Sequence, residues 1–390
     1  MKGWSKVALG ELLRRSDEAA VLDPSAEYHE VTIKLWGKGV VSRGKVRGSD
    51  VVSVRRVVRT NQLIMSKIDA RNGAIGLVPP ELDGAIVSND FPSFEFRDPE
   101  RCDAAFMGWL VRSAPFVELC KAASEGTTNR VRIKEDRFLD QQIGLPPLSE
   151  QQAVVARLGA LAEKTRTIEA HLDAVERDSL RLLVTLATRR DLSDEQRRAL
   201  GWRPGTIADI AALAPDPDPV ATDRSYPNVG ILSYARGLFG KVPIDGAATS
   251  AKTLYRIRSG QFIYSRLFAF EGAYALVSDE FDGCYVSNEF PTFDVNRDLA
   301  SSKFLMALFM TEADWQEMRA STKGVGDRRL RIQPEHILAR QIWIPPSQEL
   351  RRIDSMFDQH LALKAKHAAI RQANAALLPA TLERLFAGSA

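Results

Sequence analysis

A long internal repeat constrains the fold of this chain more than any other feature of its sequence. Residues 63–94 read LIMSKIDARNGAIGLVPPELDGAIVSNDFPSF, and residues 262–293 read FIYSRLFAFEGAYALVSDEFDGCYVSNEFPTF. These 32 positions align without a gap at an offset of 199, and 16 of them are identical. A fixed offset over so long a stretch predicts two copies of one structural unit.

The repeat extends beyond this block in both directions. Residues 132–147 match residues 331–346 at the same offset, and Trp4 matches Trp202 at an offset of 198, so a change of one residue in length lies between Trp4 and Asn61. We expect both tryptophans to pack the start of a unit against its core. The 390 residues are too many for one ordinary domain and suit two units of about 200 residues.

Each copy predicts the same mixture of strands and short helices. Apolar residues alternate or cluster in residues 63–68 and 262–267, as they do in half-buried strands. Residues 87–94 and 286–293 each contain a proline, which is typical of a strand broken at the edge of a sheet. We therefore expect an α+β fold with two similar mixed domains.

A long helix is expected to follow the first copy. Ser149 and Gln152 have the spacing of a capping box, which predicts that the helix begins at this serine. About 40 residues at ~1.5 Å per residue give a helix of ~60 Å. Apolar or small residues then recur in steps of four and three, the heptad pattern of a coiled coil: Val154, Leu158, Leu161, Thr165, Ile168, Leu172, Val175, Ser179, Leu182 and Leu186.

A second long helix should begin after Pro346, with a weaker heptad pattern. His360, Lys364 and His367 occupy its seam, and Pro379 is expected to kink or end it. Nearby alanines would allow close packing, so we expect the two long helices to pair as an antiparallel coiled coil. Two unrelated amphipathic helices are the alternative.

The chain thus divides into a domain, a helix, a second domain and a second helix. Two similar domains on a rigid spacer suit the reading of two short sites a fixed distance apart on a long polymer, and B-DNA presents the same face every ~34–36 Å. The expected boundaries are residues 1–148, 149–192, 193–346 and 347–390.

Positive charge is concentrated in two short stretches, although the net charge is only +3. Residues 34–59 contain eight Lys or Arg against a single acid, Asp50. Residues 319–331 contain five Lys or Arg against Asp327. Local basic stretches of this kind favour nucleic-acid binding. A solvated surface is the alternative for each of them.

Several tandem motifs resemble those of one known family. The block N/G-Q-L/F-I-x-S-K/R begins at Asn61 and Gly260, and VSNDFP and VSNEFP follow it. GLPPLSEQQ from Gly144 and WIPPSQE from Trp343 each open a long helix. In these motifs the chain is similar to the specificity (S, or HsdS) subunits of type I restriction–modification systems, over essentially its whole length. The second helix opening departs from the pattern, because it lacks the leucine and the paired glutamines.

This resemblance implies a non-catalytic, sequence-specific DNA-binding subunit of a phage-defence complex. Each domain would read one half of a bipartite double-stranded DNA target. The helices would set the spacer between the halves and dock two adenine-N6 methyltransferase (M) subunits, and motor–nuclease (R) subunits would join for restriction. The chain itself would need no cofactor, because S-adenosylmethionine, ATP and Mg would belong to those partners.

The candidate DNA-binding residues are basic and polar side chains of expected loops, since Lys and Arg bind phosphates while Arg, Lys, Asn, Gln, Ser and Thr read bases. In the first unit they are Lys34, Lys38, Arg43, Lys45, Lys67, Arg71, Asn72, Thr127, Thr128, Asn129, Arg130 and Arg132. In the second unit they are Tyr234, Arg236, Lys241, Arg266, Glu271, Lys323, Arg328 and Arg329.

Comparison of the two copies divides these candidates further. Basic residues at shared positions should contact phosphates, and residues at positions that differ should specify bases. Asp69 and Glu271 could accept hydrogen bonds from cytosine amino groups. The shared pairs are Lys67 with Arg266 and Arg130 with Arg329, and the differing pairs are Asn72 with Glu271 and Asn129 with Arg328.

Other classes of function lack their motifs in this sequence. The three cysteines form no CxxC pair, the five histidines lack metal-ligand spacing, and no P-loop or GxGxxG is present. LPPL and IPPS lack the Asn or Asp of the Asn-Pro-Pro-Tyr motif of adenine methyltransferases, and each precedes a helix start.

The location and the alternative functions follow from the same features. No apolar run reaches the ~18–20 residues that span a bilayer, and the first residues lack the apolar core of a signal peptide, so a cytoplasmic protein without membrane contact is expected. Two alternatives stay open: a tandem-domain scaffold that binds proteins rather than DNA, and a recognition subunit of a related defence system.

Overall fold

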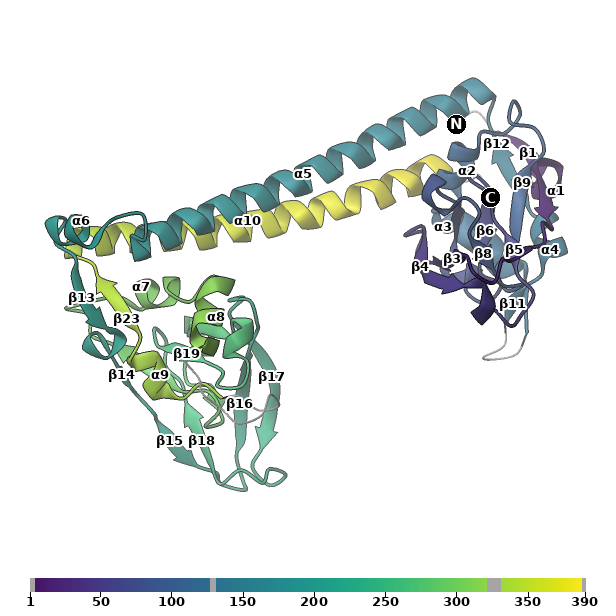
Figure 1. Ribbon diagram of the computed structural model, residues 1–390. Coiled ribbons are helices and arrows are strands. Elements are labelled where there is room, and N and C mark those ends of the chain that lie inside the picture. Colours follow the sequence, from purple (N-terminus) through teal and green to yellow (C-terminus); the bar gives the residue numbers. More distant parts are fainter. Residues whose placement is uncertain (1–3, 127–130, 321–330, 388–390) are drawn as a thin grey trace. The chain divides into compact units, whose positions relative to one another are not determined.

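The computed structural model of the chain describes residues 4–126, 131–320 and 331–387. Figure 1 shows two groups of strands and short helices together with two long helices, α5 (Leu148–Thr188) and α10 (Ser347–Phe386). The predicted α+β fold, with two similar domains and a helical linker, is confirmed.

The chain forms two compact units. The first contains residues 1–170 and 369–390, and the second contains residues 171–368. Each unit therefore holds one end of both long helices and one group of strands. We call residues 4–147 the first lobe and residues 189–346 the second lobe.

The first lobe is built on two four-stranded sheets. Its strands are β1 (Ser5–Ala8), β2 (Leu13–Ser16), β3 (Glu27–Ile33), β4 (Val40–Arg47), β5 (Arg56–Val57), β6 (Leu63–Met65), β7 (Ile75–Leu77), β8 (Ile86–Val87), β9 (Ser93–Phe96), β10 (Ser124–Glu125), β11 (Arg132–Ile133) and β12 (Gln142–Leu145). One sheet has the antiparallel order β2-β9-β6-β7. The other has the order β4-β3-β8-β5, in which β3 and β8 are parallel. β1 pairs with β12, and β10 with β11.

The second lobe repeats the two main sheets, with one strand added to the second of them, and its described residues form no counterpart of the β10–β11 pair. Its strands are β13 (Arg203–Thr206), β14 (Ala211–Leu213), β15 (Pro217–Pro219), β16 (Ser225–Ile231), β17 (Leu238–Asp245), β18 (Thr253–Arg256), β19 (Phe262–Tyr264), β20 (Tyr274–Leu276), β21 (Tyr285–Val286), β22 (Thr292–Val295) and β23 (Gln341–Ile344). The sheets have the orders β14-β22-β19-β20 and β15-β18-β21-β16-β17, and β13 pairs with β23. The same strand order in both lobes confirms the structural repeat.

Short helices complete the two lobes. In the first lobe they are α1 (Leu9–Leu12), α2 (Ala104–Leu110), α3 (Ala114–Ala122) and α4 (Glu135–Leu139). In the second lobe they are α6 (Asp194–Ala199), α7 (Ser302–Ala307), α8 (Glu312–Ala320) and α9 (Pro334–Leu338). The short 3-10 helices are η1 (Gly48–Asp50), η2 (Ala70–Asn72), η3 (Pro80–Leu82), η4 (Ile207–Asp209), η5 (Ala269–Glu271) and η6 (Asp279–Phe281).

The prediction that the repeated Asn-Asp/Glu-Phe-Pro motif lies in a strand at the edge of a sheet is wrong. In the first lobe, β8 and β9 belong to different sheets, and Pro92 lies between them. β9 is an inner strand, because it pairs with both β2 and β6. The proline immediately precedes β9, so its missing N–H removes no hydrogen bond from the strand itself.

One glycine in each lobe shows more closely where the two copies of the repeat differ in length by one residue. A Cβ on Gly48 would lie 2.1 Å from the Asp23 carbonyl oxygen, and one on Gly246 would lie 2.0 Å from that of Ala221. Both pairs are related by the offset of 198. Only glycine permits so close an approach of two backbone segments. The extra residue therefore lies after Gly48 and before the offset of 199 begins.

Each lobe shares one hydrophobic core with the ends of both long helices in its unit. In the first unit, Trp4 packs edge-on against Phe106 of α2 and Phe386 of α10, with ring centroids 6.0 and 6.1 Å apart. In the second unit, Trp202 is only 2% exposed and lies in the core with Phe357 of α10. The prediction that both tryptophans pack the start of a unit against its core is confirmed.

The predicted capping box at the start of α5 is not formed, because the helix begins at Leu148, one residue before Ser149. The backbone N–H of Gln151 donates to the Pro147 carbonyl, 3.0 Å away. The Gln151 side chain, which is fully buried, accepts from the Asp103 N–H at 2.8 Å and donates to the Arg101 and Pro146 carbonyls at 2.9 and 2.8 Å. These long-range bonds fix the start of the helix to the first lobe.

The long helices run antiparallel to each other. In the first unit, the Asn374 side chain donates to the Thr165 carbonyl at 3.1 Å and to Glu169 at 2.8 Å. In the second unit, His367 Nδ1 lies 2.8 Å from Glu176 Oε1. The partner number falls on α10 as it rises on α5, which confirms the predicted antiparallel pairing.

One of the two repeating seam positions of the first helix, that of Ile168, Val175 and Leu182, is shifted by one residue. The other is as predicted, because Leu172 is 8% exposed and Ser179 Oγ lies 3.0 Å from His360 Nδ1. Ile168, Val175 and Leu182 are 40%, 43% and 50% exposed, whereas Leu183 is fully buried. The residues after Ile168 and Val175 face α10 instead, because Glu169 and Glu176 accept hydrogen bonds there. A buried Asn or His on one helix requires a polar partner on the other. Glutamates therefore occupy these seam positions in place of the apolar residues that the heptad pattern predicts.

Pro379 does not end the second helix. α10 continues for seven residues beyond it, to Phe386. Leu382 and Phe386 are 4% and 0% exposed and belong to the core of the first unit. Packing of this last stretch offsets the hydrogen bond that the proline removes.

Candidate nucleic-acid interface

Two turns that are distant in sequence lie against each other in the first lobe. The hairpin turn between β3 and β4 contacts the turn that follows η2: the Trp36 N–H donates to the Asn72 carbonyl at 2.9 Å, and the Gly37 N–H donates to the Gly73 carbonyl at 3.0 Å. Gly73 has a φ of 76°, which glycine adopts without strain. Trp36 has a φ of 61°, which is rare for a bulky residue.

The second lobe repeats this contact bond for bond. The Tyr234 N–H donates to the Glu271 carbonyl at 2.7 Å, and the Ala235 N–H donates to the Gly272 carbonyl at 2.8 Å. Tyr234 also has a left-handed backbone, with a φ of 63°. We call residues 34–39 with 69–73, and residues 232–237 with 268–272, the paired turns of the two lobes.

The paired turns bring together candidates from separate stretches of the sequence. Figure 1 shows β3 and β4 in the first lobe, and β16 and β17 in the second, as the strands that carry the hairpin turns. Lys34, Lys38 and Arg236 are exposed on these turns, and Arg71 and Asn72 are half-buried. The first paired turn gathers Lys34, Lys38, Arg71 and Asn72, and the second gathers Tyr234, Arg236 and Glu271.

The structure adds a matched basic pair that the sequence comparison missed. Lys38 and Arg236 occupy the same position of the two hairpin turns, because the offset of 198 holds through the whole turn. Arg236 Nε donates to the Ser233 carbonyl at 2.9 Å, and its guanidinium lies 5.8 Å from the Tyr234 ring centroid. Extending the alignment through WGKG and YARG would have found both this pair and Trp36.

The strand that follows each hairpin turn carries further candidates. Arg43 lies at a bulge in β4, where the pairing with β3 changes register. Lys45 is 3.7 Å from Glu27 across the same strands. In the second lobe, Lys241 Nζ lies 5.7 Å from the Phe239 ring centroid and 5.8 Å from that of Phe290. In each lobe, basic side chains therefore continue from the paired turns along the strand that follows the hairpin turn.

Lys67 and Arg266 have partners within their own lobes. Lys67 Nζ lies 2.7 Å from Glu135 Oε1, and Arg266 donates to the Gln333 side chain. The carbonyls of Lys67 and Arg266 also accept from Ile133 and Ile332, at 2.8 and 3.0 Å. A phosphate contact would therefore require each side chain to exchange a partner, and this assignment stays a prediction.

Of the remaining candidates, Arg132 forms an ion pair, and several others lie outside the described parts of the chain. Arg132 Nη1 lies 2.9 Å from Asp90 Oδ1, and both side chains are about half exposed. The contact roles of the others stay predictions. The residues outside the described ranges are Thr127, Thr128, Asn129, Arg130, Lys323, Arg328 and Arg329.

The paired turns differ in the polar group that they present. Asn72 Nδ2 lies 3.4 Å from Asp69 Oδ1, and Glu271 accepts from the Ser233 hydroxyl at 3.0 Å. An amide can donate to and accept from an adenine, whereas a carboxylate can only accept, as from a cytosine amino group. The two lobes thus present different hydrogen-bonding groups on the same backbone frame.

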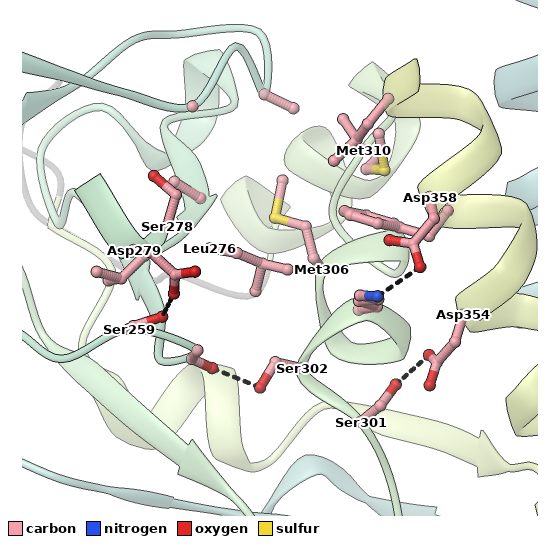
Figure 2. A pocket seen from close by; sticks show the side chains of 18 of the residues that line it. Ser259, Leu276, Ser278, Asp279, Ser301, Ser302, Met306, Met310, Asp354 and Asp358 are labelled. Carbon is pink, nitrogen blue, oxygen red and sulfur yellow. Dashed lines mark hydrogen bonds and ion pairs between the residues drawn. The ribbon is translucent and has the colours of Figure 1, made fainter. Parts of the chain in front are cut away.

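A cavity of about 680 Å³ lies behind the hairpin turn of the second lobe. Figure 2 shows Met306 and Met310 on one side and two hydrogen-bonded pairs near α10. Ser301 donates to Asp354, and Lys303 Nζ lies 2.6 Å from Asp358 Oδ2. Burial raises the pKa of the Asp354 carboxyl. These pairs attach α7 to α10, so their polar groups are engaged in holding the second lobe on its helix.

Features of a catalytic metal or thiol centre do not occur among the residues that the structure describes. No group of three or more His, Cys, Asp or Glu could hold a metal ion in those ranges. Burial raises the pKa of the Cys102 and Cys120 thiols to about 12, which keeps both cysteines protonated near neutral pH. Across the same ranges, we find no helix with the length and apolarity needed to span a bilayer.

Solved structures of one family share this fold. The HsdS subunit from Thermoanaerobacter tengcongensis is 22% identical, with a TM-score of 0.55, and the match covers 100% of this chain and 98% of that one. A chain from a structure on complex assembly and conformational transition of the type I R-M system is also 22% identical, with a TM-score of 0.62 and coverage of 99% and 96%. The chain therefore has the fold of type I specificity subunits. No family model and no curated protein matches the sequence.

Proposed function

We propose that this chain is the non-catalytic specificity subunit of a type I restriction–modification complex, in which each lobe reads one half of a bipartite DNA target. One observation carries this proposal. The same paired turns occur in both lobes, with a basic residue at the shared position, Lys38 or Arg236, and different groups at the variable position, Asn72 or Glu271. Shared cations suit phosphates, and differing polar groups suit different bases.

The long helices support a role in setting the spacer between the two half-sites. Their 41 and 40 residues correspond to ~60 Å each at ~1.5 Å per residue. Buried polar side chains hold their register, because Asn374, His367 and His360 each hydrogen-bond a particular residue of α5. Burial lowers the pKa of His360, so this residue is neutral at physiological pH. A fixed register would keep the distance between two DNA footprints constant.

Removal of the matched cations should weaken DNA binding mainly through its salt dependence. We expect the double variant Lys38→Ala with Arg236→Ala to lower the slope of log affinity against log salt by about 1.8, at ~0.9 per phosphate contact. Affinity for DNA with and without the target should fall together. Fluorescence anisotropy across a salt series, with the full chain assembled with its methyltransferase subunits, measures both quantities.

Lys121→Ala provides the matched control, because Lys121 is an exposed residue of α3 that pairs with Glu118 within its own helix. This variant should keep the wild-type slope. Wild-type binding that is weak and insensitive to salt would instead favour a protein-binding scaffold.

An apolar stripe on the helix pair supports docking of methyltransferase subunits. In the first unit, Ile168, Ile370 and Leu377 are 40%, 43% and 46% exposed. In the second unit, Val175 and Leu182 are 43% and 50% exposed. Each of these residues directly precedes a seam position, and in an antiparallel pair such positions lie along the same side of both helices. Exposed apolar side chains aligned on one side of a helix pair are typical of a protein–protein interface.

Polar residues in this stripe should weaken the assembly without unfolding the chain. We expect Val175→Asn with Leu182→Asn to cost about 2 kcal/mol of binding free energy, or ~30-fold in Kd, because half of each side chain loses its apolar contact. Titration of the methyltransferase subunit by analytical ultracentrifugation measures this change. Arg177→Asn with Arg181→Asn, at exposed outer positions of α5, is the control and should assemble as the wild type does.

A further inference from the structure

The most unusual side chains of the paired turns are two exposed aromatic rings at the same position of the repeat. Trp36 and Tyr234 are related by the offset of 198 and are 69% and 65% exposed. Both have left-handed backbones, with φ of 61° and 63°. Bulky residues seldom adopt this conformation, and the hairpins around the two residues are among the parts where the copies differ most.

The backbone of each turn does not itself require an aromatic residue. Glycine would adopt the same φ without strain, as Gly39 and Gly237 do in the same turns, with φ of 97° and 90°. The hydrogen bonds from Trp36 to Asn72 and from Tyr234 to Glu271 use backbone atoms only. The Tyr234 ring packs edge-on against Trp315 within its lobe, with ring centroids 6.0 Å apart. About two thirds of Tyr234 and of Trp36 nevertheless remains exposed, so both residues offer ring surface for a contact outside the lobe.

The surroundings of the two rings indicate the chemistry of that contact. Lys38 lies two residues after Trp36, and Arg236 lies two residues after Tyr234. The backbone N–H of Trp36 also donates to the carbonyl of Asn72, and that of Tyr234 donates to the carbonyl of Glu271. Asn72 and Glu271 are the residues that present the variable polar groups. A nucleotide has a charged phosphate, a flat base face and a polar base edge. The cation, the aromatic ring and the polar side chain of each pair of turns match these three parts.

We propose that Trp36 and Tyr234 are stacking residues, each packing its ring on the face of a nucleobase in its own half-site. This inference rests on the proposed function. A base face becomes accessible only where the duplex stack is opened, and methyltransferases flip their target base out of the stack. An exposed aromatic ring can then cover the face of a base that has lost its neighbour, as apolar wedges do in other DNA-binding proteins.

Glycine variants separate this role from a structural one. Trp36→Gly relieves the left-handed backbone, so the chain should remain as stable as the wild type or become more stable in urea unfolding. Its affinity for a duplex that carries the complete target should fall about 5-fold to 150-fold, as expected for one lost stacking contact. Because the ring is uncharged, the salt slope should not change. Trp36→Phe should retain most of the affinity. Tyr234→Gly should lose affinity as Trp36→Gly does, with some loss of stability because its ring packs against Trp315.

An abasic scan identifies the stacked base. Anisotropy titrations use the full chain with its methyltransferase subunits and duplexes that lack one base of the first half-site at a time. At one position the wild type and Trp36→Gly should bind equally, because the partner of the ring is gone. Equal binding of both glycine variants and the wild type to intact target, with a normal salt slope, would overturn the stacking role and leave the proposed function standing. Loss of the salt slope in the wild type would instead overturn the proposed function.

Discussion

Arg340→Gln is expected to lower the free energy of unfolding of the second unit by about 3–5 kcal/mol, the usual cost of breaking a buried ion pair. The Arg340 guanidinium lies 2.9 Å from Asp314 Oδ1 and from Glu317 Oε2, and it donates to the Leu308 carbonyl at 2.5 Å. The Arg340 and Asp314 side chains are 7% and 0% exposed. The variant therefore leaves the Asp314 carboxylate buried with the half-exposed Arg190 and the Thr311 hydroxyl as its partners. Urea unfolding of the full chain measures the loss.

Two further variants test the cause of this loss. Arg190 pairs with Asp314 at 3.1 Å but is 53% exposed, so Arg190→Gln should cost only about 1 kcal/mol or less. The first lobe has Gln141 at the position that matches Arg340 at the offset of 199. Asp314 matches Phe116, because the offset is 198 across α3 and α8, which begin at Ala114 and Glu312. Arg340→Gln combined with Asp314→Phe, which copies that pair, should recover much of the lost stability, because no charge is left buried. A double variant less stable than the single one would contradict this explanation.

The fold of the two lobes could be predicted from the repeat, because two similar sequences adopt the same backbone fold even where their individual side-chain contacts differ. The two copies share 16 of 32 positions in the central block, and both lobes form the same strand order. Local patterns were less reliable at the helices. The capping-box spacing pointed to Ser149, whereas Gln151 makes the bonds that fix the helix start, and these bonds reach Arg101 and Asp103. A contact across about 50 residues leaves no local pattern.

The shifted helix seam has a similar cause. The apolarity of Ile168 and Val175 favoured them as seam residues, but the opposite helix offers Asn374 and His367 at this level. Buried polar groups need partners, so glutamates take the seam and the apolar side chains turn outward. Which face of a helix is buried depends on the residues of the opposite helix. The sequence of one helix alone therefore does not predict its buried face.

The candidate site was predictable in composition but not in arrangement. The basic stretch from Lys34 and the turn at Asn72 were both identified from residue type. Their contact through Trp36 joins residues 36 apart, and it became evident only from the fold. Trp36 itself was missed, because an exposed aromatic residue carries no signal in a search for charges and base-edge donors.

The largest effect on function is expected from exchanging one lobe. Replacement of residues 1–148 by the same region of another chain with this fold and a different target should change one half of the recognised motif completely. The second half and the spacer should stay the same, because the second lobe and the helix register are unaltered. Replacement of residues 193–346 is the matched control and should change only the other half.

Methylome sequencing of the host is the most direct measurement of this claim. Deletion of the chain should remove one split adenine-methylation motif, and each exchange should restore a motif that differs in a single half. Methylation that is unaffected by deletion, or an exchange that alters both halves at once, would contradict the view that two equivalent lobes read DNA independently.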